Sequence, residues 1–173
     1  FQLAVDLGAL LVALITWQPV RICTEARVAV AGLAGLLAAI GVANALRVPP
    51  VRDVTVTIRG LSPLFDGYRL LQLSDLHITR LFSARWAARV VARANAAAAD
   101  LIVVTGDFID GSVDMRRADV APLADLRAPD GVLAAPGNHE YFFDYTDWIR
   151  HLSALGFDVL ENQHRIITRG TAQ

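Results

Sequence analysis

Three short clusters of acidic, amide and imidazole side chains follow one another along the chain. They are Asp75-Leu-His77, Gly106-Asp107 and Gly137-Asn138-His139-Glu140. Each cluster comes directly after a short apolar run that is typical of a strand. Carboxylate, amide and imidazole groups are all ligands of divalent cations in proteins. Because the ends of neighbouring strands can bring their side chains together, the three clusters predict one metal site.

The spacing within the clusters predicts a role for each side chain. Asp75 and His77 are two residues apart, so in an extended segment both point the same way and can hold one ion. The carboxylate of Asp107 can bridge two ions, and the side-chain oxygen of Asn138 can bind the second. Two cations roughly 3.5–4 Å apart can activate a hydroxide and hold phosphate oxygens for in-line attack. His139 is predicted to protonate the leaving oxygen or to stabilise negative charge there.

The elements that must position these side chains alternate between strands and helices. The expected strands span residues 54–58, 68–73, 101–104, 131–135, 158–160 and 164–168. The expected helices span residues 84–98, 115–126 and 145–155. Ser83 is placed to cap the first helix, Pro122 disturbs the second, and Gly156 ends the third. This order predicts an α/β sheet with right-handed crossovers, whose ligands bind beyond the carboxyl ends of the strands.

The clusters and their flanking residues resemble those of the calcineurin-like metallophosphoesterase family. The words that carry the resemblance are LLQLSDLHIT, LIVVTGDFIDG and LAAPGNHEYF, between Tyr68 and Arg169. The resemblance is greatest to membrane-attached bacterial members, whose domain follows N-terminal helices. It implies a four-layer α/β/β/α sandwich that hydrolyses phosphate mono- or diesters, of which this chain would supply the N-terminal part.

The resemblance also implies a role for each matched residue. Asp75 and His77 match the ligands of the first ion, and Asp107 matches the ligand that bridges both. Asn138 matches a ligand of the second ion, and His139 matches the catalytic histidine. Two divalent ions are therefore expected, and this donor set tolerates manganese, iron, zinc or cobalt.

The family pattern continues with a lone histidine and a Gly-His-x-His word, and the printed sequence stops before either. His151 and His164 stand in no such motif and are predicted to be satisfied surface histidines. Since the chain starts at Phe1 without a methionine and stops just after a predicted strand, we expect a fragment of a longer protein. Without the later histidines, the chain as printed is expected to be inactive.

A membrane segment is predicted ahead of the metal-binding part. Val28–Leu46 contains roughly 19 residues without a charge, which is long enough for a helix to cross a bilayer. Leu3–Trp17 is apolar except for Asp6 and predicts an earlier helix, cut at its start, that ends at Gln18-Pro19. The predicted organisation is therefore a transmembrane hairpin over residues 1–47, a proline-containing linker over 48–53, and a phosphoesterase part over 54–173.

The arginines near the predicted helices bear on the orientation in the membrane. Arg21 and Arg27 in or beside the short loop Gln18–Ala26 favour a cytoplasmic loop. Arg47, Arg52 and Arg59 follow the second helix and favour the opposite arrangement. We expect an integral protein of the cell membrane whose catalytic domain is extracytoplasmic.

Composition excludes some classes of function. The net charge is −1, which argues against a basic surface that binds nucleic acid. Cys23 is the single cysteine, so there is no internal disulfide and no cysteine-based zinc site. The hydrophobic fraction of 54% exceeds the roughly 45–50% of soluble domains, as the membrane segment requires.

Two rival functions stay open at this point. The phosphoesterase-like domain can be a non-catalytic part of a membrane protein that binds a partner or ligand, or the helices can belong to a sensor or transporter. For the enzyme, attachment to the membrane suggests a phosphoester of a lipid head group or of the cell envelope as substrate. Tyr141, Phe142 and Phe143 can form a wall for that substrate or pack in the core.

Overall fold

The computed structural model describes residues 2–17 and 23–172 of the chain. The predicted helix end at Gln18-Pro19 and the predicted loop arginine Arg21 lie outside the described residues. Contacts divide the chain into two units, Phe1–Arg47 and Val48–Gln173, which are described separately below.

The first unit contains two helices, α1 (Gln2–Thr16) and α2 (Thr24–Ala45). Among the described residues, α2 alone is long and apolar enough to cross a membrane, with a mean hydropathy of 2.0 over its apolar window. The 15 residues of α1 are fewer than a bilayer requires. Within this unit, Asp6 Oδ1 lies 3.0 Å from a guanidinium nitrogen of Arg27. The acidic residue of the first apolar stretch is therefore paired with a charge near the start of α2.

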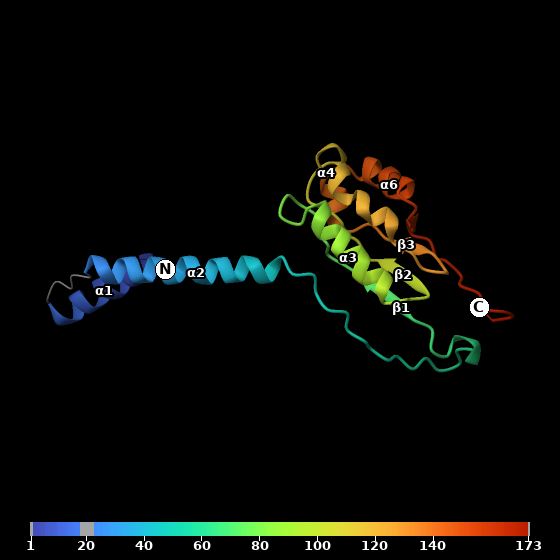
Figure 1. The fold of residues 1–173 in the computed structure, drawn as a ribbon, viewed down its shortest axis with the longest axis horizontal. Coiled ribbons are helices and arrows are strands. Elements are labelled where there is room, and N and C mark those ends of the chain that lie inside the picture. The colour runs from blue at the N-terminus through green and yellow to red at the C-terminus, as the bar shows by residue number, and fades with distance from the viewer. Residues whose placement is uncertain (1, 18–22, 173) are drawn as a thin grey trace. The chain divides into compact units, whose positions relative to one another are not determined.

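The second unit contains a parallel sheet of four strands with helices beside it (Figure 1). The strands pair in chain order: β1 (Leu70–Leu73), β2 (Leu101–Val104), β3 (Val132–Ala134) and β4 (Asp158–Val159). Each strand is parallel to the next, so every connection must cross over through a helical segment. This confirms the predicted α/β class with a parallel sheet.

The crossover helices pack on one another as well as on the sheet. They are α3 (Ala84–Ala96), α4 (Val113–Val120) with the 3₁₀ turn η2 (Ala121–Asp125), α5 (Asn138–Phe142) and α6 (Tyr145–Ala154). α3 contacts α4 and η2, and α4 contacts α6. As predicted, Pro122 limits α4, because the chain forms the tighter turn η2 around it. Gly156, with φ +98°, follows the end of α6, also as predicted.

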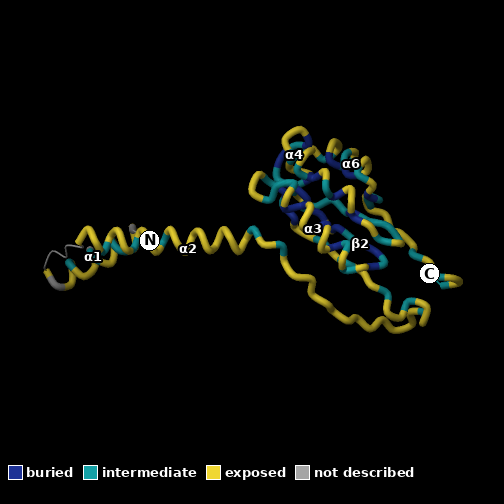
Figure 2. Tube along the Cα trace, in the orientation of Figure 1, coloured by how far each residue is buried: buried dark blue, intermediate teal, exposed yellow. Residues whose placement is uncertain are grey.

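The core lies between the sheet and its helices (Figure 2). The strand register places Leu71, Ile102 and Val132 side by side, and all three belong to or pack against this core. The alternate positions Gln72 and Val103 point to the opposite face, where Gln72 is exposed. The described residues thus supply one helical layer and one sheet, which is part of the four-layer sandwich that the family resemblance implies.

Two of the predicted strands are wrong. Residues 54–58 alternate in hydrophobicity but form no strand, and Val54 is 80% exposed. Residues 164–168 form no strand either, and the nearest pairing is an isolated bridge between Arg169 and Ala172. Alternation makes a strand only where a neighbouring strand offers hydrogen-bond partners, and no described strand lies beside these segments. Ser83 occupies the predicted N-cap position of α3, but its side chain makes no capping bond; Asp119 accepts from Ala84 N–H instead.

A small polar cluster joins the C-terminal segment to the amino ends of the strands. Arg169 forms an ion pair with Asp100, lies 3.9 Å from Asp130, and places its guanidinium 4.8 Å from the ring centre of Tyr68. The Tyr68 hydroxyl donates to Asp130 at 2.7 Å. The pKa of Asp100 is lowered, chiefly because the backbone N–H of Arg69 donates to its carboxylate and additionally because Arg169 is adjacent.

Replacing Arg169 with glutamine is expected to speed amide hydrogen exchange in residues 165–172, because the ion pair with Asp100 is lost. A lowered carboxyl pKa stabilises the fold above the unfolded value of about 3.9, and the contribution is lost as the pH falls through the lower folded value. The difference between the variant and the parent should therefore shrink below about pH 4. The exposed pair Arg165–Asp158 offers the control, Arg165→Gln; equal effects of both variants would contradict a specific role for Arg169.

Candidate metal centre

The segments that follow β1 and β2 run side by side beyond the sheet. His77 N–H donates to the carbonyl oxygen of Asp107 at 3.0 Å, and Ile78 N–H donates to that of Phe108 at 2.9 Å. Asp110 N–H then donates to the carbonyl oxygen of Ile78 at 3.1 Å. This short ladder aligns the first two clusters and places them at the carboxyl ends of the strands, as predicted.

The backbone at the site is left-handed rather than extended. Asp75, His77 and Asp107 have φ values of +54°, +42° and +54°. The expectation that Asp75 and His77 share an extended segment is therefore wrong, although their side chains do approach each other. Left-handed conformations are costly for residues with a side chain, and they concentrate at functional sites where the surroundings enforce them.

Two glycines let the second and third clusters approach closely. A Cβ atom at Gly106, which has φ +87°, would collide with the backbone of Gly137. A Cβ atom at Gly137 would in turn collide with Asp107. Both positions therefore require glycine, and this close approach places Asp107 directly beside the start of α5.

The third cluster begins a helix instead of lying in a loop. Gly137 is the N-cap of α5, so Asn138, His139 and Glu140 form its first turn. His139 N–H donates to Asp107 Oδ1 at 3.0 Å. One carboxylate oxygen of Asp107 is thus held by the α5 backbone, which fixes the direction of the other.

The side chain of Glu140 is completely buried and holds the site together. Its Oε1 accepts from Phe108 N–H at 2.9 Å, and its Oε2 accepts from Asp107 N–H at 3.1 Å and Gly137 N–H at 2.6 Å. The last bond is the backward arm of a capping box. The sequence analysis gave Glu140 no role of its own; its place three residues after a glycine N-cap was the available signal.

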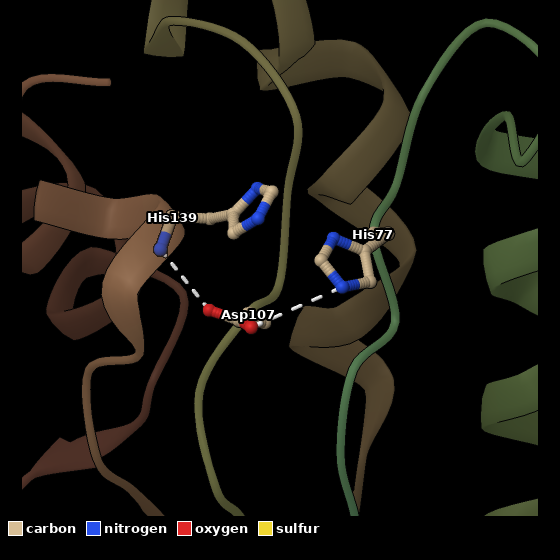
Figure 3. A group of neighbouring side chains, drawn as sticks. All are labelled: His77, Asp107 and His139. Carbon is tan, nitrogen blue, oxygen red and sulfur yellow. Dashed lines mark hydrogen bonds and ion pairs between the residues drawn. The ribbon is translucent and has the colours of Figure 1, made fainter. Parts of the chain in front are cut away.

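The donor atoms gather around one point (Figure 3). His77 Nε2 lies 3.9 Å from Asp75 Oδ1 and 3.9 Å from Asp107 Oδ2. A ligand atom from each of His77, Asp107 and His139 lies within 4.8 Å of the others. Atoms bound about 2.0–2.2 Å from one ion stand roughly 3–4.4 Å apart, so the first two distances fit a shared cation.

The Asn138 side chain lies beside the carboxylate of Asp107. With its amide nitrogen turned toward that carboxylate, Asn138 donates to Asp107 Oδ2 and Oδ1 at 3.2 and 3.3 Å. This orientation pairs the two groups by hydrogen bonding alone, and metal ligation by Asn138 stays a prediction.

Asp110 is a residue of the site that the sequence analysis missed. Its Oδ1 lies 3.1 Å from His77 Nδ1 and 2.5 Å from His139 Nδ1. The second contact has the distance of an ion pair but not the angles of a hydrogen bond, so His139 Nδ1 lacks a hydrogen-bond partner in the described part of the chain. Asp110 thus contacts both imidazoles, whose ring centres are 4.4 Å apart. Its position three residues after Asp107 was the only sequence signal.

The two remaining histidines do not join the cluster. His164 is exposed, as predicted. His151 is half-buried against Trp148 rather than on the surface, and its buried Nε2 has no hydrogen-bond partner within the described residues. Burial is the main reason that the pKa of His151 is lowered.

Comparison with known families identifies the family of this chain. The sequence model of the calcineurin-like phosphoesterases matches residues 68–168, which include β1 to β4 and all three clusters. The chain belongs to this family of metallophosphoesterases. No solved structure gives a significant match to the chain.

Several curated proteins are similar to the chain. A "Transmembrane protein with metallophosphoesterase domain" of Danio rerio is 31% identical over 138 residues, 79% of this chain and 32% of the relative. The "Uncharacterized metallophosphoesterase YkuE" of Bacillus subtilis is 34% identical over 107 residues, 60% of this chain and 37% of the relative. The "UDP-2,3-diacylglucosamine pyrophosphatase LpxG" of Chlamydia muridarum is 33% identical over 76 residues, 43% of this chain and 23% of the relative.

The chain is much shorter than these proteins. It spans about a third of the first relative, and less of the others from Bos taurus and Caenorhabditis elegans, at 29% and 25%. Residues 68–168, which the family model matches, include His77, Asp107 and His139.

Proposed function

We propose that these residues belong to a membrane-tethered, metal-dependent phosphoesterase that hydrolyses phosphate mono- or diesters at a dinuclear centre. The observation that supports the proposal is that His77 Nε2 lies 3.9 Å from both Asp75 Oδ1 and Asp107 Oδ2, with the Asn138 side chain beside Asp107. Because the chain spans about a third of its first curated relative, the activity of the whole protein is part of the proposal.

Each site residue receives a role in this proposal. Asp75 and His77 would hold one ion, Asn138 would hold the other, and Asp107 would be shared. Bound divalent ions supply Lewis acidity and lower the pKa of water, which is the chemistry that phosphoester hydrolysis needs. The donor set suits manganese, iron, zinc or cobalt.

His139 is proposed as the catalytic histidine. Its Nδ1 lies 2.5 Å from Asp110 Oδ1, so Nε2 is the ring nitrogen left to give a proton to the leaving oxygen. Asp110 would keep the ring of His139 in place. Its contact with His77 Nδ1 likewise leaves His77 Nε2 for the ion.

The membrane part of the proposal depends on α2 and on the relatives. α2 is a possible transmembrane span, and two relatives are named as transmembrane proteins. We propose that residues 1–47 anchor the protein in the cell membrane and that the domain is extracytoplasmic. One relative is named for a pyrophosphatase activity on a diacylated sugar nucleotide, which favours a lipid or envelope phosphoester as substrate.

Metal removal tests the proposed activity. The full-length protein, stripped with a chelator, should hydrolyse none of a panel of chromogenic phosphate mono- and diesters, and re-addition of manganese, iron, zinc or cobalt should restore turnover. A His164→Ala variant should behave like the parent, because this histidine lies outside the donor cluster.

The panel also decides between the enzyme and its rival. Turnover that survives complete metal removal would contradict the proposed centre. A protein that binds the metals but hydrolyses no ester of the panel would instead support a non-catalytic domain that binds a partner or ligand.

A further inference from the structure

Exposed aromatic rings stand beside the proposed catalytic histidine. The ring centre of Phe142 is 5.8 Å from that of His139, yet the residue is 71% exposed. Tyr141 is 62% exposed. Phe143, at 6.1 Å from His139, packs against the core instead. Phe143 therefore packs against the core, whereas Phe142 and Tyr141 face solvent.

The Tyr141 ring is held in place by a neighbouring tyrosine. Tyr141 stacks on Tyr145 with ring centres 4.3 Å apart and planes within 13° of parallel. The hydroxyl of Tyr145 donates to Glu161 at 2.5 Å. Phe142 is four residues after Asn138 on α5, so both side chains project toward the same side of that helix. A ring on the side of α5 that carries Asn138 can contact a ligand of the proposed centre.

The site has an acidic region and an apolar ring, which would contact different parts of a bound ester. Asp75, Asp107 and Asp110 make the surroundings of the proposed ions acidic. An ester bound there would place its phosphate at those ions. Any group attached to the oxygen that His139 protonates must then lie within reach of His139, and Phe142 is the exposed apolar surface at that distance. An apolar group that packs on this ring would gain favourable free energy from the burial of apolar surface, which a polar group would not gain.

We infer that Phe142 selects phosphoesters whose leaving group carries an apolar moiety next to the ester oxygen. This inference rests on the proposed function and deepens it. An acyl or alkyl chain and a planar aromatic ring both offer the apolar surface that is required for packing on Phe142. Phe142 is a specificity-determining residue in this scheme and takes no part in proton transfer.

Binding of phosphonates tests the inference without turnover. Full-length protein in detergent with manganese is titrated calorimetrically with methyl-, hexyl- and 1-naphthylphosphonate. The parent should bind at least one of the two apolar ligands more tightly than methylphosphonate. Phe142→Ala should weaken apolar binding about five- to tenfold and leave methylphosphonate within twofold. Preference for the hexyl ligand indicates a lipid-like leaving group, and preference for the naphthyl ligand an aromatic one.

Matched variants and esters separate this inference from the proposed function. Ile166→Ala removes an exposed apolar side chain of the C-terminal segment and should change nothing, and Phe142→Leu should retain part of the apolar preference. Equal affinity of the parent for all three ligands, no binding of any, or an equal loss for all in Phe142→Ala would overturn the inference. Hydrolysis of phosphoesters with such equal binding would leave the proposed function intact. Apolar selectivity through Phe142 without any hydrolysis would support the inference about Phe142 and contradict the proposed function.

Discussion

Replacing Asp107 with alanine should lower kcat/KM for metal-dependent phosphoester hydrolysis more than about 100-fold. Removing a residue that merely supports a metal ligand costs about 10–100-fold in affinity or activity, and Asp107 is expected to be a ligand itself. Its carboxylate is the group that both His77 Nε2 and the Asn138 side chain approach. Its loss should therefore affect both proposed ions together.

The experiment pairs kinetics with metal content. The parent, Asp107→Ala and the isosteric Asp107→Asn are loaded with manganese, and bound metal is measured by atomic emission together with kcat/KM. Both variants should retain less metal than the parent. Asp114→Ala is the control, because the Asp114 side chain is 97% exposed on α4. If Asp107→Asn retained both full metal content and full activity, the proposed bridging role would be refuted.

The parts of the fold that could be predicted from sequence are those whose signal is local. Leu101–Val104 is an unbroken β-branched and leucine run, and the structure makes it a strand with these bounds. The stop after Leu155 could be predicted because a glycine follows, and Gly156 adopts the positive φ that such a helix end favours. The alternation of these elements then limited the topology to parallel strands with crossovers.

What could not be predicted depends on partners far away in the chain. Residues 54–58 carry the alternation of a strand, but the hydrogen-bond partners that a strand needs are not encoded in the segment itself. The left-handed backbone of Asp75 and His77 is likewise imposed from outside, by the ladder that joins them to residues 106–110. A pattern of residue types contains no information about that ladder.

The candidate site shows the same division. The order of the three clusters and the strand before each predicted that Asp75, His77, Asp107 and Asn138 would meet as ligands with His139 beside them. In the structure, ligand atoms of His77, Asp107 and His139 lie within 4.8 Å of one another. Asp110 was missed because no local pattern shows that a carboxylate will lie between two imidazoles from other segments. The sequence could reveal candidate ligands, whereas the groups that orient them required coordinates.

Glu140 is the position where a single substitution should cost the most stability. Glu140→Ala would leave the buried N–H group of Phe108 and the part-buried N–H groups of Asp107 and Gly137 without their acceptor. An unsatisfied buried donor costs about 1–3 kcal/mol and a part-buried one less, so the expected loss over the three groups is about 3–6 kcal/mol. Because domains are stable by only about 5–15 kcal/mol, this variant should be close to unfolding.

A graded series separates the acceptor role of Glu140 from its size. Glu140→Gln keeps one acceptor oxygen, which can serve Asp107 and Gly137, but places an NH₂ group against Phe108 N–H. It should therefore lie between the parent and Glu140→Ala in thermal stability. Hydrogen exchange should accelerate first at residues 107, 108 and 137, since those amides lose their bonds to Glu140 directly. Glu161→Ala removes an exposed carboxylate with a single hydrogen bond and serves as the control. If both Glu140 variants had the same melting temperature as the parent, the carboxylate could not be what holds the second and third clusters together.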